Sequence, residues 1–266
     1  MGLTIHYKLK AKGREAHARK LVEALHQAAH DLPFKEIGNI VDLAGDECDF
    51  NKREKDDPVR WLLIQANGSL QLKNTHSMGN GEMGDTWIDV TPVRIIAFTA
   101  WPGEGAEESN FGLCQYPAGI FSPNYGTLKT KLSGWRWSSF CKTQYASDPG
   151  CGGVQNFLQC HLTLIALLDK AKQLGCIESV DDEGKFWEKR DVEALVKAVG
   201  SWNEMIAAFG GKLKDVVGGG LEMPISNYPD FEKLEMAGQN QLPPGIEALT
   251  SLIKQVSLKS RPPTLT

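Results

Sequence analysis

The sequence predicts an α+β fold, a two-layer sandwich in which helices cover one face of a mixed, largely antiparallel sheet. Two segments with strand periodicity are each followed by one with helical periodicity: residues 4–9, 14–32, 135–146 and 154–174. Two further apolar segments, residues 59–66 and 93–101, have no helical pattern between them. This succession favours the two-layer sandwich over the alternative, a three-layer α/β fold in which helices separate successive strands.

The first unit begins with a strand at residues 4–9. Its apolar side chains alternate with polar ones, so that Ile5, Tyr7 and Leu9 share one face and Thr4, His6 and Lys8 share the other. Residues 14–32 carry the apolar stripe of an amphipathic helix, which Pro33 ends. Residues 36–43 predict a second strand, so this unit reads as a βαβ unit, one half of a ferredoxin-like pair.

The middle of the chain predicts strands joined by loops. The charged residues 46–57 are typical of a solvated loop, and residues 59–66 and 93–101 are apolar enough on both faces to be central strands. Residues 67–85 contain four glycines together with Asn, Ser and His, which indicates a long connection. An irregular apolar stretch is expected from residue 109 to residue 125.

The second unit is the centre of the predicted architecture. In residues 135–146 one face is mainly apolar and the other mainly polar, with Trp135, Trp137, Cys141 and Tyr145 on the first and Arg136, Ser138, Lys142 and Gln144 on the second. The Pro- and Gly-rich residues 147–153 end the strand. A buried helix over 154–174 follows and stops at Gly175, and residues 176–180 form a strand before an acidic turn.

The chain divides into three predicted parts. Residues 1–130 hold the N-terminal βαβ unit and the central strands, and residues 131–237 hold the second unit packed into the same globule. A helix from Asp191 closes at Gly210 and Gly211, and residues 218–220 form a glycine joint. Residues 238–266 are an appendage with a short amphipathic helix at 246–256.

Composition excludes several classes of protein. The chain has 266 residues and a formal net charge of -4, which argues against a general nucleic-acid binder. No segment has the length or apolar character of a membrane span, and the N-terminus lacks the apolar run of a signal peptide. Six cysteines are scattered singly, so reduced thiols are expected. These features predict a cytoplasmic protein.

A ligand site is predicted on the sheet face that turns away from the helices. The polar side chains of the two alternating strands share that face, and the candidates are His6, Lys8, Arg136, Lys142 and Gln144. Cationic groups on one surface can hold a carboxylate or a phosphate, and arginine can do so with two hydrogen bonds. The alternative is a solvated face, because antiparallel sheets are often wet on one side.

A second anion site is predicted at the N-terminus of the helix over 154–174. Gly152 and Gly153 precede it, and the free backbone N–H groups of a helix N-terminus attract anions. The loop lacks the lysine and hydroxyl residue of a phosphate-binding loop. The alternative is therefore that these glycines serve a tight strand-to-helix turn.

Cys141 and His161 are the candidate catalytic pair. His161 lies on the apolar stripe that faces the sheet, at the depth where a strand residue near Cys141 or Lys142 would lie. A thiol beside an imidazole can act as a nucleophile. The acidic turn lies at the far edge of the sheet, which argues against a carboxylate that orients His161. The alternative is that His161 is a hydrogen-bonded core residue.

The acidic turn itself is a candidate metal site. Asp181, Asp182 and Glu183 are consecutive carboxylates at a strand end, and hard oxygen ligands suit Mg²⁺ or Mn²⁺. The alternative is conformational, because turns that precede a glycine are rich in acids.

Two functions follow from these observations. The first is a protein that binds a small anionic molecule at the sheet, with hydrolysis of that molecule as an extension. The second is a non-catalytic interaction protein that docks a protein partner on the open sheet face or through the C-terminal helix. The residues leave open whether the protein is an enzyme.

Overall fold

The computed structural model describes residues 3–77, 83–217, 225, 228 and 231–238. Its centre is a seven-stranded sheet in the order β11-β1-β10-β7-β6-β2, with β3 also paired to β6. These strands are β1 Thr4–Ala11, β2 Glu36–Ile37, β3 Val41–Ala44, β6 Arg94–Trp101, β7 Ser109–Gln115, β10 Trp135–Lys142 and β11 Ile177–Asp182. Every neighbouring pair is antiparallel. The predicted α+β class is confirmed.

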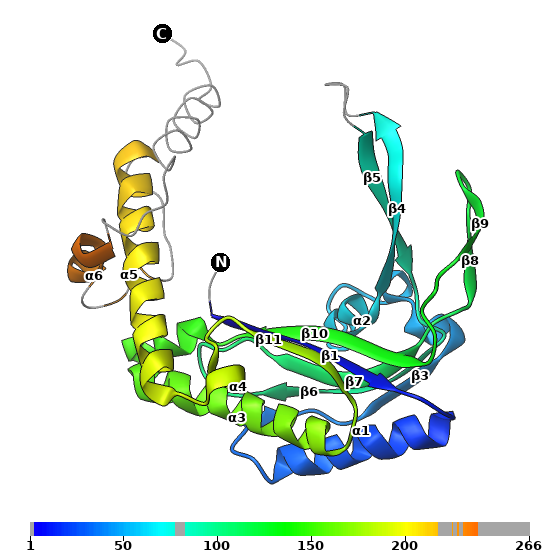
Figure 1. Cartoon of the computed structure of the whole chain (residues 1–266), viewed down its shortest axis with the longest axis horizontal. Helices are drawn as coiled ribbons and strands as arrows, with labels where there is room; N and C mark the ends of the chain where they lie inside the picture. The colour runs from blue at the N-terminus through cyan, green and yellow to red at the C-terminus, as the bar shows by residue number, and fades with distance from the viewer. Residues whose placement is uncertain (1–2, 78–82, 218–224, 226–227, 229–230, 239–266) are drawn as a thin grey trace.

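Two long helices form the second layer. α1 (Glu15–His30) and α3 (Gly153–Gln173) lie beneath the sheet in Figure 1, and their apolar stripes join the main core. α3 connects β10 to β11, and β1 lies between these two strands. Since β1 is antiparallel to both, β10 and β11 run parallel, as the predicted βαβ unit requires. The ferredoxin-like arrangement of the two halves stays a prediction.

A short helix covers part of the opposite face. α2 (Arg60–Ala66) contacts β6 and β10, and Figure 1 shows it on the side of the sheet away from α1 and α3. Residues 109–114 of β7 are therefore buried on both faces. The open face of the sheet is consequently limited to β10, β1 and β11.

The remaining elements project from the sheet. At one end, β4 (Gly68–Ser77) pairs with β5 (Met83–Val90), and β8 (Gly119–Ser122) pairs with β9 (Gly126–Lys129). Figure 1 shows both hairpins standing above the sheet, with the long α5 (Val192–Val217) at the other end. α4 (Phe186–Lys189) precedes α5, and α6 (Phe231–Gly238) packs beside it.

Side chains complete the junction between β7 and β10. The ladder between these strands joins Trp135 to Gln115 and Arg136 to Cys114. Further along, the carbonyl of Asn110 accepts hydrogen bonds from the Tyr7 hydroxyl and the Trp137 indole, both at 2.7 Å. A buried carbonyl without a hydrogen-bond donor costs free energy, and these two side chains supply the donors that a neighbouring strand would otherwise provide.

Two expectations for the middle of the chain are wrong. Residues 59–66 form α2 and not a central strand, because Leu62, Leu63 and Ala66 have helical spacing and pack into the core. Residues 67–85 are not a structureless connection, since they supply β4 and the start of β5. The glycines that indicated a loop include Gly68, whose missing side chain lets Tyr116 approach: a Cβ there would lie 2.9 Å from Tyr116 Cε1.

Several boundaries also differ from those predicted. Residues 36–43 form two short strands, β10 ends at Lys142, and residues 109–129 are β7, β8 and β9. α5 continues through Gly210 and Gly211 to Val217, so these glycines do not close the helix. The predicted joint at 218–220 and the predicted helix at 246–256 lie outside the described residues. The main hydrophobic cluster takes side chains from both predicted halves of the chain.

We expect Gly112→Ala to destabilise the protein. Gly112 lies on β7 where an added Cβ would meet Ala97 Cβ at 2.4 Å and the Ile96 carbonyl oxygen at 2.7 Å. Overpacking of this kind costs about 1–3 kcal/mol. Urea unfolding measures the loss in the free energy of unfolding. The matched control is Gly200→Ala in α5, where a Cβ meets no atom within 4 Å and helix propensity predicts equal or higher stability.

Candidate functional site

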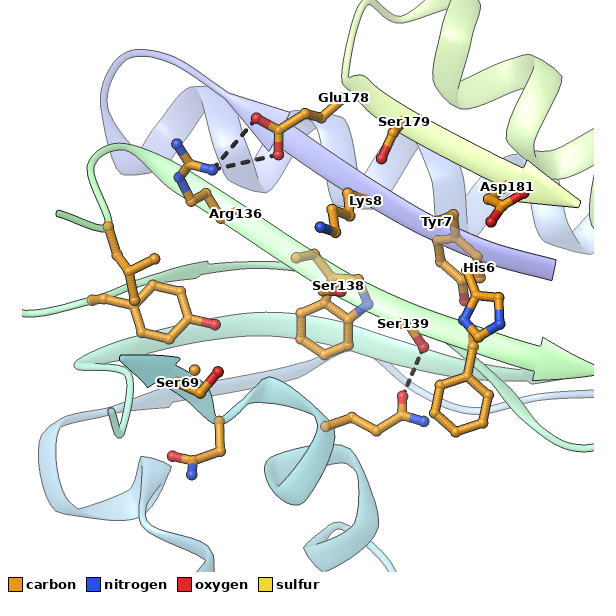
Figure 2. A pocket seen from close by; sticks show the side chains of 17 residues that line it. His6, Tyr7, Lys8, Ser69, Arg136, Ser138, Ser139, Glu178, Ser179 and Asp181 are labelled. Atoms are coloured by element: carbon orange, nitrogen blue, oxygen red, sulfur yellow. Dashed lines mark hydrogen bonds and ion pairs between the residues drawn. The ribbon is translucent and has the colours of Figure 1, made fainter. Parts of the chain in front are cut away.

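A large cavity lies on the open face of the sheet. Its volume is about 680 Å³, and Figure 2 shows its floor, formed by β10, β1 and β11. The strand registers arrange the floor in rows, because directly opposed residues of antiparallel strands share a face. His6 is opposite Phe140 and Asp181, Lys8 is opposite Ser138 and Ser179, and Lys10 is opposite Arg136.

One end of the floor carries a cluster of paired charges. Arg136 Nη1 lies 3.4 Å from each carboxylate oxygen of Glu178, and Lys10 Nζ lies 3.2 Å from Glu178 Oε1. Arg136 Nε also donates to the Ser133 carbonyl at 3.1 Å. Two cations therefore share one carboxylate, which leaves this end with a surplus of positive charge.

Lys8 occupies the middle of the floor. Figure 2 shows it between the Arg136–Glu178 pair and the row that holds His6. Its ammonium makes no ion pair or hydrogen bond with the part of the chain that the structure describes. The hydroxyl residues Ser138 and Ser179 flank it. This cation and its neighbouring hydroxyls are available to a ligand.

The other side of the cavity is built from α2, β4 and the segments that follow β7 and precede β10. Gln65, Asn67, Ser69, Tyr116 and Leu132 line it, and Figure 2 shows Ser69 across the cavity from β1. The Tyr116 hydroxyl donates to the Ala66 carbonyl at 2.7 Å, which fixes the ring. Asn67 Oδ1 is buried and has no hydrogen-bond donor among the described residues, so it can still accept one.

The predicted ligand residues separate into two groups. His6, Lys8 and Arg136 line the cavity. Lys142 does not, because its ammonium lies 4.5 Å from the Tyr145 ring centroid, beyond the end of the floor. Gln144 is not on the open face: it is buried, accepts from the Leu3 N–H and donates to Asn203, each at 3.2 Å. The expectation for Gln144 is wrong because β10 ends at Lys142 and a 3₁₀ turn reorients the chain.

Gly152 and Gly153 lie away from the cavity and form a turn. Both have positive φ, at 108° and 67°. Their backbone N–H groups donate to the carbonyls of Pro149 and Asp148, at 3.2 and 2.9 Å. These donors are therefore occupied by the chain itself, which favours the conformational interpretation of the two glycines.

Cys141 and His161 do not form a nucleophile–base pair. The Cys141 thiol donates to the Glu107 carbonyl at 3.1 Å, and burial raises the pKa of this thiol well above its usual value. His161 Nδ1 lies 2.9 Å from the Thr143 hydroxyl and Nε2 lies 3.3 Å from Asp182 Oδ2. Both side chains are fully buried and outside the cavity.

The acidic turn does not gather into a metal site. Asp182 is buried beside His161, Glu183 accepts from the Thr4 N–H at 2.9 Å, and Asp181 lies on the cavity floor near Lys185. The described residues contain no group of three His, Cys, Asp or Glu side chains that could hold a metal ion. The expectation that the acids are too distant to orient His161 is also wrong, because β11 ends beside the middle of α3.

His161, Asp182 and Thr143 form a closed hydrogen-bond network. Since a carboxylate accepts only, His161 Nε2 donates to Asp182, and Nδ1 is hydrogen-bonded to the Thr143 hydroxyl. Asp182 also accepts from the backbone N–H groups of Gly184 and Trp187, at 2.8 and 2.9 Å. Burial alone would raise the pKa of Asp182, but these hydrogen bonds outweigh it and lower the pKa. The network joins α3 to β11.

Several site residues were missed by sequence reasoning. Glu178 and Ser179 share the floor with Lys8, because a register shift between Lys8 and Leu9 interrupts the alternation of β11, and the sequence has no pattern that predicts this shift. Tyr116 and Asn67 belong to segments predicted as loop or strand. Their place in the site depends on how α2 and β4 pack, for which the sequence has no local pattern.

Comparisons with protein-family models, with curated proteins and with solved structures found no match for this chain. Among the described residues, the helices are too short or too polar to span a bilayer.

We expect Asp182→Asn to cost about 3 kcal/mol of stability near neutral pH, because an amide nitrogen would then face a donor in the buried network. The folded pKa of Asp182 is below its ordinary value of 3.8, so its ionised form contributes fully above that value. The contribution is lost as the pH falls through the folded pKa.

Urea unfolding at several pH values tests this expectation. The stability difference between wild type and Asp182→Asn should shrink as the pH falls below 3.8. The exposed Asp181→Asn variant is the control and should change stability little. A difference that stays constant across the acid range would contradict an ionised Asp182.

Proposed function

We propose that the protein binds a small anionic molecule in the cavity on the open face. The observation that carries this proposal is Lys8, a cation on the cavity floor that the described residues leave unpaired. The hydroxyls of Ser138 and Ser179 on either side can donate to the same anion. Arg136, shared with Glu178, adds positive potential at one end.

A volume of about 680 Å³ supports a small molecule over a flat protein interface. Small-molecule sites are concave and usually measure about 300–1,000 Å³. The rival proposal, a docking face for a protein partner, would need a broad shallow surface. Its other version, docking through residues 246–256, concerns a segment outside the described residues.

The polar lining further restricts the ligand. Serine, asparagine and glutamine side chains line the cavity, together with the aromatic residues Tyr7, Tyr116, Trp137 and Phe140. This combination supports a ligand with hydroxyl groups as well as a carboxylate or phosphate. A cytoplasmic location belongs to this proposal, and the free thiol state of all six cysteines is compatible with it.

Hydrolysis of the bound molecule is the second part of the proposal. His6 and Asp181 are opposed on the cavity floor, and an imidazole beside a carboxylate can act as a general base. His161 and Cys141 would not take part, because both are buried outside the cavity.

We expect Lys8→Ala to weaken ligand binding. A thermal-shift screen with phosphates, carboxylic acids and sugar acids identifies a ligand, and calorimetry then measures its affinity. Removal of the ammonium should weaken binding at least about tenfold, since a charge-assisted hydrogen bond contributes about 1.5–3 kcal/mol. Lys142→Ala is the matched control, because its ammonium lies against Tyr145, and its affinity should equal that of wild type.

Two results would contradict binding at the floor. One is a ligand whose affinity is the same for Lys8→Ala and wild type. The other is a loss of affinity in Lys142→Ala that equals the loss in Lys8→Ala.

For hydrolysis, we expect His6→Ala to lower turnover about 100-fold or more, as loss of a general base does, while ligand affinity changes little. A panel of chromogenic phosphate and carboxylate esters supplies the substrates. His30→Ala on the exposed surface of α1 is the control. Turnover that is unchanged in His6→Ala, or no turnover of any ester by wild type, would contradict this part of the proposal.

A further inference from the structure

We propose that the exposed face of the β4–β5 hairpin extends the cavity, and that the ligand is an oligosaccharide with one acidic sugar at its end. The acidic sugar lies on the floor at Lys8, and neutral sugars lie along the hairpin. This inference rests on the proposed anion site and names the class of its ligand. It depends on the register of the hairpin and on the chemistry of its exposed side chains.

The register of β4 and β5 places one set of side chains on a common face. Ser69 is opposite Asp89 and Gln71 is opposite Trp87, so these four share a face with Asp85. We call this face the wall. Ser69 also lines the cavity, so the wall is continuous with the floor.

The second face of the hairpin is partly covered. Leu70, Leu72 and Ile88 are partly buried there. The Thr86 hydroxyl lies 3.3 Å from the Tyr125 hydroxyl of the neighbouring hairpin. Since β8–β9 lies against that side, the wall points away from it and over the open sheet. Figure 1 shows β4–β5 between β8–β9 and the space above the sheet.

The side chains of the wall suit sugars. Trp87 is 62 % exposed, and an indole ring offers a flat apolar surface on which the C–H face of a pyranose can stack. Gln71 Nε2 donates to Asp85 Oδ2 at 2.6 Å, which orients both planar groups. The Gln71 amide can pair with sugar hydroxyls, which both donate and accept.

Charge determines where the acidic group belongs. The floor holds Lys8 and Arg136 together with the carboxylates of Glu178 and Asp181, and Lys8 makes no ion pair with the described residues, whereas the wall holds the carboxylates Asp85 and Asp89. A polyanion along the wall would meet two like charges, which disfavours nucleic acid and a uniformly acidic polysaccharide. An oligosaccharide whose terminal unit alone carries a carboxylate matches both surfaces.

Calorimetry with defined sugars tests the inference. The probes are glucuronic acid, a trisaccharide with terminal glucuronic acid on two neutral units, the corresponding neutral trisaccharide, N-acetylneuraminic acid and sialyllactose. We expect at least one acidic trisaccharide to bind about tenfold tighter than its acidic monosaccharide. The neutral trisaccharide should bind more weakly than both.

Variants separate the wall from the floor. Trp87→Ala should reduce the trisaccharide affinity to that of the monosaccharide and leave the monosaccharide affinity unchanged, whereas Trp87→Phe should keep most of the gain. The control is Phe121→Ala on β8, an aromatic residue 76 % exposed and outside the wall, which should bind as wild type. Lys8→Ala should weaken both acidic ligands.

The outcomes distinguish the two proposals. Sugar binding along the wall is contradicted if trisaccharides bind no tighter than acidic monosaccharides, or if Trp87→Ala still binds the trisaccharide tighter than the monosaccharide. The anion site at Lys8 would remain supported in both cases. If other anions bind at Lys8 but no acidic sugar does, the proposal that the ligand is an oligosaccharide is contradicted. If no anion binds, both proposals fail. Tighter binding of an oligonucleotide than of every sugar, dependent on Trp87, would also overturn the inference.

Discussion

Pairing of β1 along both of its edges is the constraint on which the site depends. Because β1 is in register with β10 and β11, His6 and Lys8 each have a neighbour from both strands on the open face. A slip of one residue would exchange the two faces of the strand. The buried side chains of Ile5, Tyr7 and Leu9 oppose that slip, since it would expose them. The core therefore fixes which groups form the cavity floor.

Unequal coverage of the sheet creates the cavity. α2 contacts β6 and β10 on the upper face, where β7 between them is buried, and the rest of that face, over β10, β1 and β11, is open. Gln65 of α2 accepts hydrogen bonds from Ser139 of β10 and Asn110 of β7, at 2.7 and 2.8 Å. The same contacts that complete the sheet thus hold α2, and the hairpin that follows it, beside the floor.

Regular spacing of apolar residues correctly predicted the first strand and the first helix, and the lack of such spacing explains the wrong predictions for α2 and β4. The strand at residues 4–9 and the helix at 14–32 have regular patterns, and both are present as β1 and α1. The seven residues of α2 are too few for an apolar run to distinguish helix from strand. One face of β4 is exposed, so this strand contains many polar residues and a glycine. The composition of the segment therefore resembled that of a loop.

The alternation of polar and apolar residues along the predicted strands also predicted part of the site. It placed His6 and Arg136 on the open face, but it failed for Gln144 because a turn follows Lys142. Partners from β11, α2 and β4 could not be predicted, since their proximity depends on long-range register and packing. Asp181 and Asp182 show this most clearly: they are adjacent in sequence but opposed to His6 and Ile5, on opposite faces. Asp182 is buried in the core, where His161 and two backbone N–H groups donate hydrogen bonds to it. Asp181 and His6 instead border the cavity. The face of the sheet on which each pair lies therefore determines which histidine–carboxylate pair can contact a ligand.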